Sequence, residues 1–234
     1  MPSLPVFDRK GEEVGTYDIE STDLAPQINK QLLHDVVVMY QANQRLGTFR
    51  TRSRSEISAS TRKLYRQKGT GNARAGSRRS GVRRGGGHIK AKRPRDFSYR
   101  LPRKAVQLAT RMAIAAKVEG SQLVVIDELS FSQPKTRDMN AILLALGLSG
   151  KSTLVTVESH DVNVYKSARN IDRVSVSPVS DLNALAVLRP QRMLVTRAAL
   201  DAIKAKAAGE SSADATSAGD DSAGDDSAGD AEQD

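Results

Sequence analysis

Arginine and lysine dominate one stretch of the chain, and the chemistry open to them is the binding of anions. Between Arg45 and Lys104 there are 20 Lys or Arg residues against two acidic residues, Glu56 and Asp96, which gives a net charge of +18. These side chains neutralise phosphates, and the planar guanidinium of arginine also stacks on bases. The residue types therefore predict a surface that binds a folded polyanion.

The same stretch has almost nothing to bury. Its large apolar side chains between residues 50 and 95 are only Ile57, Leu64, Tyr65, Val82 and Ile89. Ordering a residue costs about 1 to 2 kcal/mol of backbone entropy, so a segment without a core needs an outside source of binding energy. Glycines at positions 69, 71, 76, 81, 85, 86 and 87 allow sharp turns or a close approach to a partner. We therefore expect this segment to gain its shape on binding.

Aromatic residues lie between the arginines and could stack on unpaired bases. They are Phe49, Tyr65, Phe97 and Tyr99. For Phe97 and Tyr99 an equally good interpretation is that they fix the base of the segment to a folded domain. For Tyr65, which is next to Arg66, base stacking is the favoured interpretation.

Acidic residues after two predicted strands suggest a different chemistry. We expect Asp127-Glu128 and Glu158 at the carboxyl ends of neighbouring strands, where a metal-dependent nuclease could use all three carboxylates. However, Asp and Ser are also the usual caps where a strand turns into a helix, as in residues 158–161, and capping is favoured. No catalytic residue, metal site, cofactor or small-molecule substrate is therefore predicted.

Two helices are predicted on either side of the basic stretch. An apolar row at a spacing of four predicts one core-facing helix that ends near residue 43. The row comprises Leu24, Ile28, Leu32, Val36 and Tyr40, with Leu33 and Val37 beside it. The second helix begins at Pro102 and ends at Gly120. Because its ends return to one domain, the basic stretch is predicted to be an insertion loop. A short hairpin of residues 5–7 and 13–17 precedes the first helix.

Strands and helices alternate in the rest of the chain. The predicted order is a strand at 122–127, a helix at 135–146, a strand at 152–157, a helix at 162–169, a strand at 174–176, a helix at 181–188, a strand at 193–195 and a helix at 197–206. This alternation predicts an α/β fold with a mostly parallel sheet and helices on both faces, in three layers. The predicted domains are one α/β domain (residues 1–44 and 102–208), the basic loop (45–101) and a tail (209–234).

The tail consists largely of SAGDD repeats with a net charge of −9, without Lys, Arg or a large apolar residue. We expect it to be disordered. The simplest interpretation is a solubility tail, and the alternative is a shield that keeps wrong polyanions off the basic loop. The chain has no cysteine, no signal-peptide pattern and no apolar stretch of 18 residues, so a cytoplasmic protein without a membrane partner is predicted.

Four short motifs resemble one known family. They are residues 62–77 (RKLYRQKGTGNARAGS), 84–87 (RGGG), 94–99 (PRDFSY) and 101–104 (LPRK). In this order they closely resemble the loop of the bacterial large-subunit ribosomal protein four family, and the likeness extends over residues 1–207. This sequence departs from the family around Val82-Arg83, where an aromatic residue is common, and at residues 88–92, where an apolar run is common.

The resemblance implies a structural protein of the large (50S) ribosomal subunit that binds 23S rRNA early in assembly. In that family the loop threads through rRNA to the wall of the peptide exit tunnel, near a constriction shared with another ribosomal protein. Lys68, Gly69, Thr70 and Gly71 would form the tip that lines the tunnel. The residues expected to bind rRNA are Arg45, Arg50, Arg52, Arg54, Arg62, Lys63, Tyr65, Arg66, Gln67, Lys68, Gly69, Thr70, Gly71, Arg74, Arg78, Arg79, Arg83, Arg84, Gly85, Gly86, Gly87, His88, Lys90, Lys92, Arg93, Arg95, Arg100, Arg103 and Lys104.

Two further hypotheses use the same basic loop. In the first hypothesis the protein is the metal-dependent nuclease described above, and the basic loop binds its nucleic-acid substrate. In the second the protein is a nucleic-acid chaperone outside the ribosome.

Overall fold

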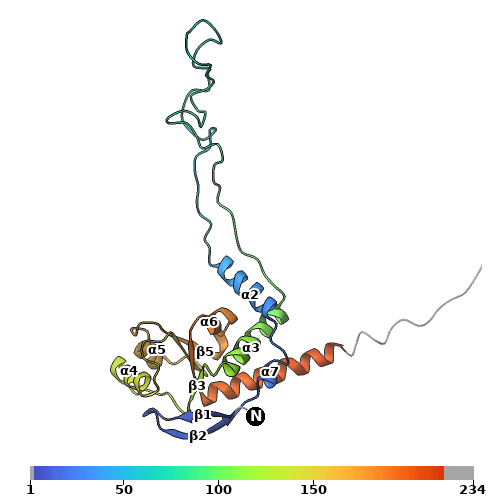
Figure 1. The fold of residues 1–234 in the computed structure, drawn as a ribbon, viewed down its shortest axis with the longest axis vertical. Coiled ribbons are helices and arrows are strands. Elements are labelled where there is room, and N and C mark those ends of the chain that lie inside the picture. Colours follow the sequence, from blue (N-terminus) through green and yellow to red (C-terminus); the bar gives the residue numbers. More distant parts are fainter. Residues whose placement is uncertain (1–2, 219–234) are drawn as a thin grey trace, which may run out of the picture. The chain divides into compact units, whose positions relative to one another are not determined.

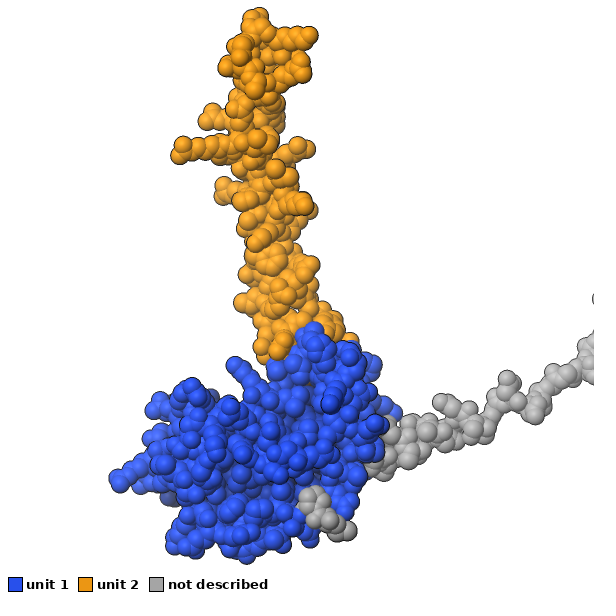
Figure 2. Space-filling model, viewed as in Figure 1, with its two compact units in different colours: residues 1–38, 101–234 blue, residues 39–100 orange. Residues whose placement is uncertain are grey.

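The computed structural model describes residues 3–218, with side chains described as far as Ala208. The chain divides into two compact units (Figure 2). The described residues 3–38 and 101–218 belong to the first, which we call the globular unit. Residues 39–100 form the second, which we call the arm. The predicted basic loop of residues 45–101 is therefore almost entirely within the arm.

A six-stranded sheet forms the centre of the globular unit (Figure 1). Its strands lie in the order β2-β1-β3-β6-β4-β5, and every pairing is parallel except that of β1 with β2. The strands are β1 (Ser3–Phe7), β2 (Glu13–Asp18), β3 (Leu123–Ile126), β4 (Thr153–Val157), β5 (Val174–Pro178) and β6 (Arg192–Thr196). The predicted α/β class with a mostly parallel sheet is confirmed.

Helices cover the sheet, and the burial of β4 shows that they do so on both faces. All five residues of β4 are buried. Val155 and Val157 belong to an apolar cluster with residues of α4 (Thr136–Ala145) and α5 (Val162–Ala168). A second group of helices packs together, α3 against α1 and α6, and α1 against α7. These are α1 (Ser21–Leu24), α3 (Arg103–Glu119), α6 (Ala184–Leu188) and α7 (Arg197–Ala218).

The predicted single helix from Leu24 to residue 43 is wrong, because the chain forms two helices there. Helix α1 ends at Leu24, and the backbone of the next residue, Ala25, is extended (φ −155°, ψ 131°). Pro26 follows, and a proline disfavours the helical conformation of the residue before it. Helix α2 (Lys30–Asn43) then begins, and the Asn29 side chain accepts hydrogen bonds from the backbone N–H groups of residues 31 and 32.

The break changes which residues of α2 are buried. The structure buries Leu33, Val36 and Met39, whereas Leu32 and Tyr40 of the predicted row are half-buried. Val36 of the predicted row and Leu33 beside it are buried, so the core-facing side of α2 was predicted in part, whereas the burial of Met39 was not predicted.

Two boundaries near the C-terminus also differ from the prediction. The segment at 181–188 is a short 3-10 turn, η1 (Val179–Asp181), followed by α6, and the Asn183 side chain accepts a hydrogen bond from Ala186 N at 2.8 Å. Helix α7 continues past the predicted end at residue 206 to Ala218, because this alanine-rich segment contains no proline. Of the predicted tail (209–234), residues 219–234 lie outside the described residues. Within residues 3–218, no helix has the length and apolar character needed to cross a membrane.

Candidate nucleic-acid interface

The arm doubles back on itself, and its two sides lie side by side (Figure 1). Backbone hydrogen bonds join the sides, from Thr51 N to Lys92 O (3.0 Å) and from His88 N to Arg52 O (3.0 Å). Nearer the base, Arg95 N donates to Gly47 O at 3.2 Å. Residues 44–100 contain only two isolated β-bridges, Ser53 with His88 and Lys63 with Ser77. The arm is thus held together by scattered contacts and has no regular sheet.

An aromatic clasp closes the base of the arm. The guanidinium carbons of Arg45 and Arg95 lie 3.7 Å and 4.1 Å from the centre of the Phe97 ring. The Phe49 ring centre is 6.1 Å from that of Phe97. Cation–π contacts of this kind contribute about 0.5 to 1 kcal/mol at exposed sites. Phe97 therefore joins the two sides of the arm to each other, a role that neither interpretation of this residue had included.

Several glycines are required by the arm's own packing. A Cβ atom on Gly86 would lie 1.9 Å from Ser80 O, and one on Gly87 would lie 2.4 Å from Arg54 N. Real Cβ atoms do not approach backbone atoms so closely, so a side chain would force the backbone apart. By contrast, a Cβ on Gly71 or Gly76 would meet nothing within 4 Å. The arm's own fold explains Gly86 and Gly87, and the open positions are free for a partner to approach.

One arginine of the arm points inward. Arg79 donates from Nε to Ala59 O at 2.5 Å, and its own carbonyl accepts from Gly87 N at 3.0 Å. Ser77 Oγ adds a hydrogen bond to Ser60 O at 3.0 Å. Arg79 is half-buried, whereas the adjacent Arg78 is exposed. Its position indicates an internal cross-link of the arm.

Glu56 closes a turn of the arm by binding Arg50 and Ser53, and we call this contact the latch. The sequence did not lead us to predict it. Its carboxylate accepts from Ser53 N at 2.9 Å and from the Arg50 guanidinium at 2.8 Å. The backbone hydrogen bond from Ser53, followed by the side-chain hydrogen bond from Arg50, lowers the pKa of Glu56 to about 2. The signal available in the sequence was that Glu56 is the only acidic residue between Arg45 and Arg95.

The far end of the arm is a closed loop. Leu64 N donates to Gly76 O at 3.1 Å, and the Tyr65 hydroxyl donates to Ala73 O. Within the loop, the Arg66 guanidinium donates to Gly69 O at 2.8 Å, where Gly69 has a φ of +82°. Tyr65 was predicted to stack on a base, and in the structure its hydroxyl forms a hydrogen bond to the opposite side of the loop. Residues 66–69, by contrast, are exposed to solvent.

The remaining cations face solvent. Between Arg45 and Arg100 every arginine and lysine is exposed except Arg79. Arg103 and Lys104, also predicted to contact RNA, are exposed in the first turn of α3, in the globular unit. The two acidic residues of the stretch are engaged within the arm, Glu56 as described and Asp96 by the N–H and hydroxyl of Ser98. The arm thus presents a dense positive surface on a thin support.

Comparison with known proteins identifies the family. Residues 19–206 match the sequence pattern of the ribosomal protein L4/L1 family. The chain belongs to this family. It is 52% identical over 204 residues to the large ribosomal subunit protein uL4 of Rhodopirellula baltica, an alignment that covers 87% of this chain and 92% of that protein. The large ribosomal subunit protein uL4 of Carboxydothermus hydrogenoformans is 42% identical over 200 residues, with 86% and 97% covered.

Membership of the ribosomal protein L4/L1 family confirms the resemblance seen in the arm motifs. It also confirms that the chain has a structural role and is not an enzyme, because this is a family of ribosomal proteins. The family pattern ends at residue 206, so the acidic tail lies outside the matched region.

The structure agrees with a non-enzymatic role at the residues that suggested a nuclease. The expectation that Asp127-Glu128 and Glu158 follow neighbouring strands is wrong, because β6 lies between β3 and β4. Glu128 is instead near Arg9, at 3.8 Å, and accepts from Ser130 Oγ at 2.8 Å. Asp161 caps α5 by accepting from Asn163 N at 2.8 Å, so the favoured capping interpretation is confirmed there.

Proposed function

We propose that this protein is a structural constituent of the large ribosomal subunit and that its arm binds 23S rRNA early in assembly. In this role it would work on ribosomes in the cytoplasm, in contact with rRNA and neighbouring ribosomal proteins. The observation that carries the proposal is the exposed positive surface of the arm, which has no core of its own and few internal contacts. Phosphates of a folded RNA are the natural counter-charges for such a surface.

Salt dependence of RNA binding tests the proposal. Each phosphate contact releases counterions, so the affinity for a 23S rRNA fragment should fall steeply with salt. Arg66→Ala with Lys68→Ala should weaken binding and reduce the salt slope by about 1 to 2, because about 0.9 is lost per contact. The matched control is Lys166→Ala with Arg169→Ala, two exposed cations in and just after α5. Equal affinities and salt slopes for the two double variants would show that Arg66 and Lys68 do not bind the RNA, and an affinity that does not fall with salt would contradict the proposal.

We further propose that the tip of the arm, residues 68–71, lines the peptide exit tunnel. The proposal is supported by the family resemblance of these residues and by the exposed, closed loop to which they belong. Because the chain has no cysteine, Lys68→Cys gives a single reactive site for cross-linking. On ribosomes with stalled nascent chains, this site should cross-link to the nascent chain, whereas Lys166→Cys should not. Absence of a cross-link from Lys68→Cys at every nascent-chain length would contradict the proposal.

A further inference from the structure

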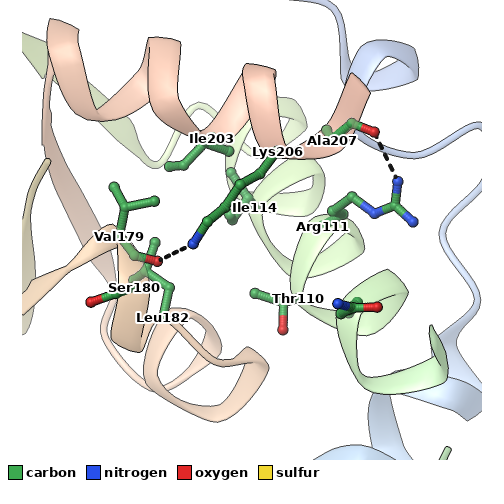
Figure 3. Close-up of a pocket in the computed structure, with 10 residues that line it drawn as sticks. Thr110, Arg111, Ile114, Val179, Ser180, Leu182, Ile203, Lys206 and Ala207 are labelled. Atoms are coloured by element: carbon green, nitrogen blue, oxygen red, sulfur yellow. Dashed lines mark hydrogen bonds between the residues drawn. The ribbon is translucent and has the colours of Figure 1, made fainter. Parts of the chain in front are cut away.

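A hollow in the globular unit lies between α3, α7 and the 3-10 turn η1 (Figure 3). Its volume is about 310 Å³. Apolar side chains from all three elements form part of its lining, among them Ile114, Val179 and Ile203. The hollow is large enough to accept several residues of an extended chain.

Two cations lie at the edges of this hollow. Lys206 Nζ approaches Val179 O at 3.4 Å, and Arg111 Nη1 donates to Ala207 O at 3.3 Å, as the dashed lines in Figure 3 show. Gln107, Thr110 and Ser180 supply further polar groups. None of the described residues that line the hollow is acidic. The site therefore has an apolar floor and a positive rim, which suits an anionic segment with small side chains.

Such a segment is present in the chain itself. Residues 219–234 carry seven acidic residues and no basic residue, and the residues between the charges are mainly Ala, Gly and Ser. We propose that this acidic segment folds back and occupies the hollow between α3, α7 and η1. The segment lies outside the region matched by the family pattern, so the proposal concerns a property of this chain beyond its role in the ribosome.

Chain length permits this contact. Ala207 lines the hollow, and α7 continues to Ala218. Eleven helical residues span about 17 Å at 1.5 Å per residue. The 16 residues from 219 to 234 can extend about 53 Å at 3.3 Å per residue. The segment can therefore return to the hollow with residues to spare, and its tether keeps its effective concentration in the millimolar range.

The attraction is mainly between exposed charges, so it should depend on salt. At 0.1 M ionic strength the Debye length is about 10 Å, and at 1 M it is about 3 Å. The acidic segment should occupy the hollow at low salt and leave it at high salt. The arm is the competing cationic surface for the same segment, and the experiment must separate the two.

Paramagnetic relaxation enhancement in the full-length protein distinguishes binding to the hollow from binding to the arm. Ser227→Cys introduces the only cysteine of the chain, so a spin label attaches at one position in the acidic segment. At low salt we expect loss of amide signal intensity at Thr110, Ile114, Ser180 and Ile203, and recovery of these signals at 1 M salt. Signal loss confined to the arm, or no signal loss in either unit, would overturn the proposal.

Two sets of variants test the charges. Replacing Asp220, Asp221, Asp225 and Asp226 by Asn leaves the globular unit untouched and should restore the signals around the hollow. Lys206→Gln should do the same, whereas Lys204→Gln should not, because Lys204 donates to Asp18 O and lies 4.8 Å from the Tyr17 ring, away from the hollow. Signal loss that persists in the Asn variant would show proximity by tethering alone and would overturn the proposal.

Discussion

At the scale of single residues, a buried lysine and an exposed glutamate each stabilise a connection that the sequence did not reveal. Lys117 is 5% exposed, and its ammonium group donates to Pro190 O and to Gln122 Oε1, both at 2.7 Å. It thereby ties α3 to the segments that lead into β6 and β3. Nothing in the spacing of apolar residues distinguishes this lysine from an exposed one, because its partners are a backbone carbonyl and an amide.

Lys117→Met should destabilise the globular unit by about 1 to 3 kcal/mol, because the buried carbonyl of Pro190 and the half-buried amide oxygen of Gln122 lose their donor. Burial, followed by repulsion from Arg192, lowers the pKa of Lys117. The unfolded chain then binds more protons than the folded protein in the window below the ordinary value of 10.5, so this residue makes stability rise with pH there. Urea unfolding at several pH values should show a stability gap between wild type and variant that widens as the pH approaches 10. A gap that is constant with pH would contradict the assignment.

Glu56 should make the turn at residues 50–56 sensitive to acid. Because hydrogen bonds to its carboxylate lower its pKa from 4.5 to about 2, its contribution is complete above pH 4.5 and is lost as the pH falls towards 2. In Glu56→Gln the Ser53 amide should exchange its hydrogen faster than in wild type at neutral pH. The amide of Leu64, bonded to Gly76 O, is the internal control and should be unaffected. Equal exchange at Ser53 in both proteins would show that the latch is not formed in solution.

At the scale of elements, the hairpin pattern predicted β1 and β2, and the alternation of strands with helices predicted the other four strands and the mostly parallel sheet. The position of β6 between β3 and β4 was not predictable in this way, because a strand's place in a sheet depends on partners distant in sequence. The break before α2 could have been predicted from Pro26. In the arm, composition correctly suggested exposed cations, but it could not show which glycines pack against the arm's own backbone. Those contacts depend on chain pairing that has no periodic signal.

The glycines of the arm provide a test at the same scale. Gly86→Ala should distort the turn at residues 80–87, because its Cβ would lie 1.9 Å from Ser80 O. RNA binding should weaken as the neighbouring cations are displaced. Gly15→Ala, in β2 of the globular unit, is the matched control, since its Cβ would meet nothing within 4 Å. Binding to the 23S rRNA fragment, measured at one salt concentration, should rank wild type and Gly15→Ala together and Gly86→Ala below them.

At the scale of the whole molecule, the apolar core and the proposed RNA-binding surface belong to different units. The globular unit contains the sheet and the apolar clusters, whereas the arm contains exposed cations and scattered hydrogen bonds. Arg66→Ala with Lys68→Ala should therefore leave the thermal midpoint of the globular unit unchanged while reducing incorporation into large subunits on sucrose gradients. A lowered midpoint in this variant would show that the arm contributes to the fold of the globular unit.

The central position of β6 also affects how the protein folds during translation. Strands β3 and β4 do not pair with each other, and each pairs with β6, which is the last strand to be translated. A nascent chain that stops before Arg192 therefore has two separate half-sheets, β2-β1-β3 and β4-β5. The arm leaves the translating ribosome well before these halves can join. We therefore expect the basic segment to be accessible to cellular RNA before the sheet of the nascent chain is complete.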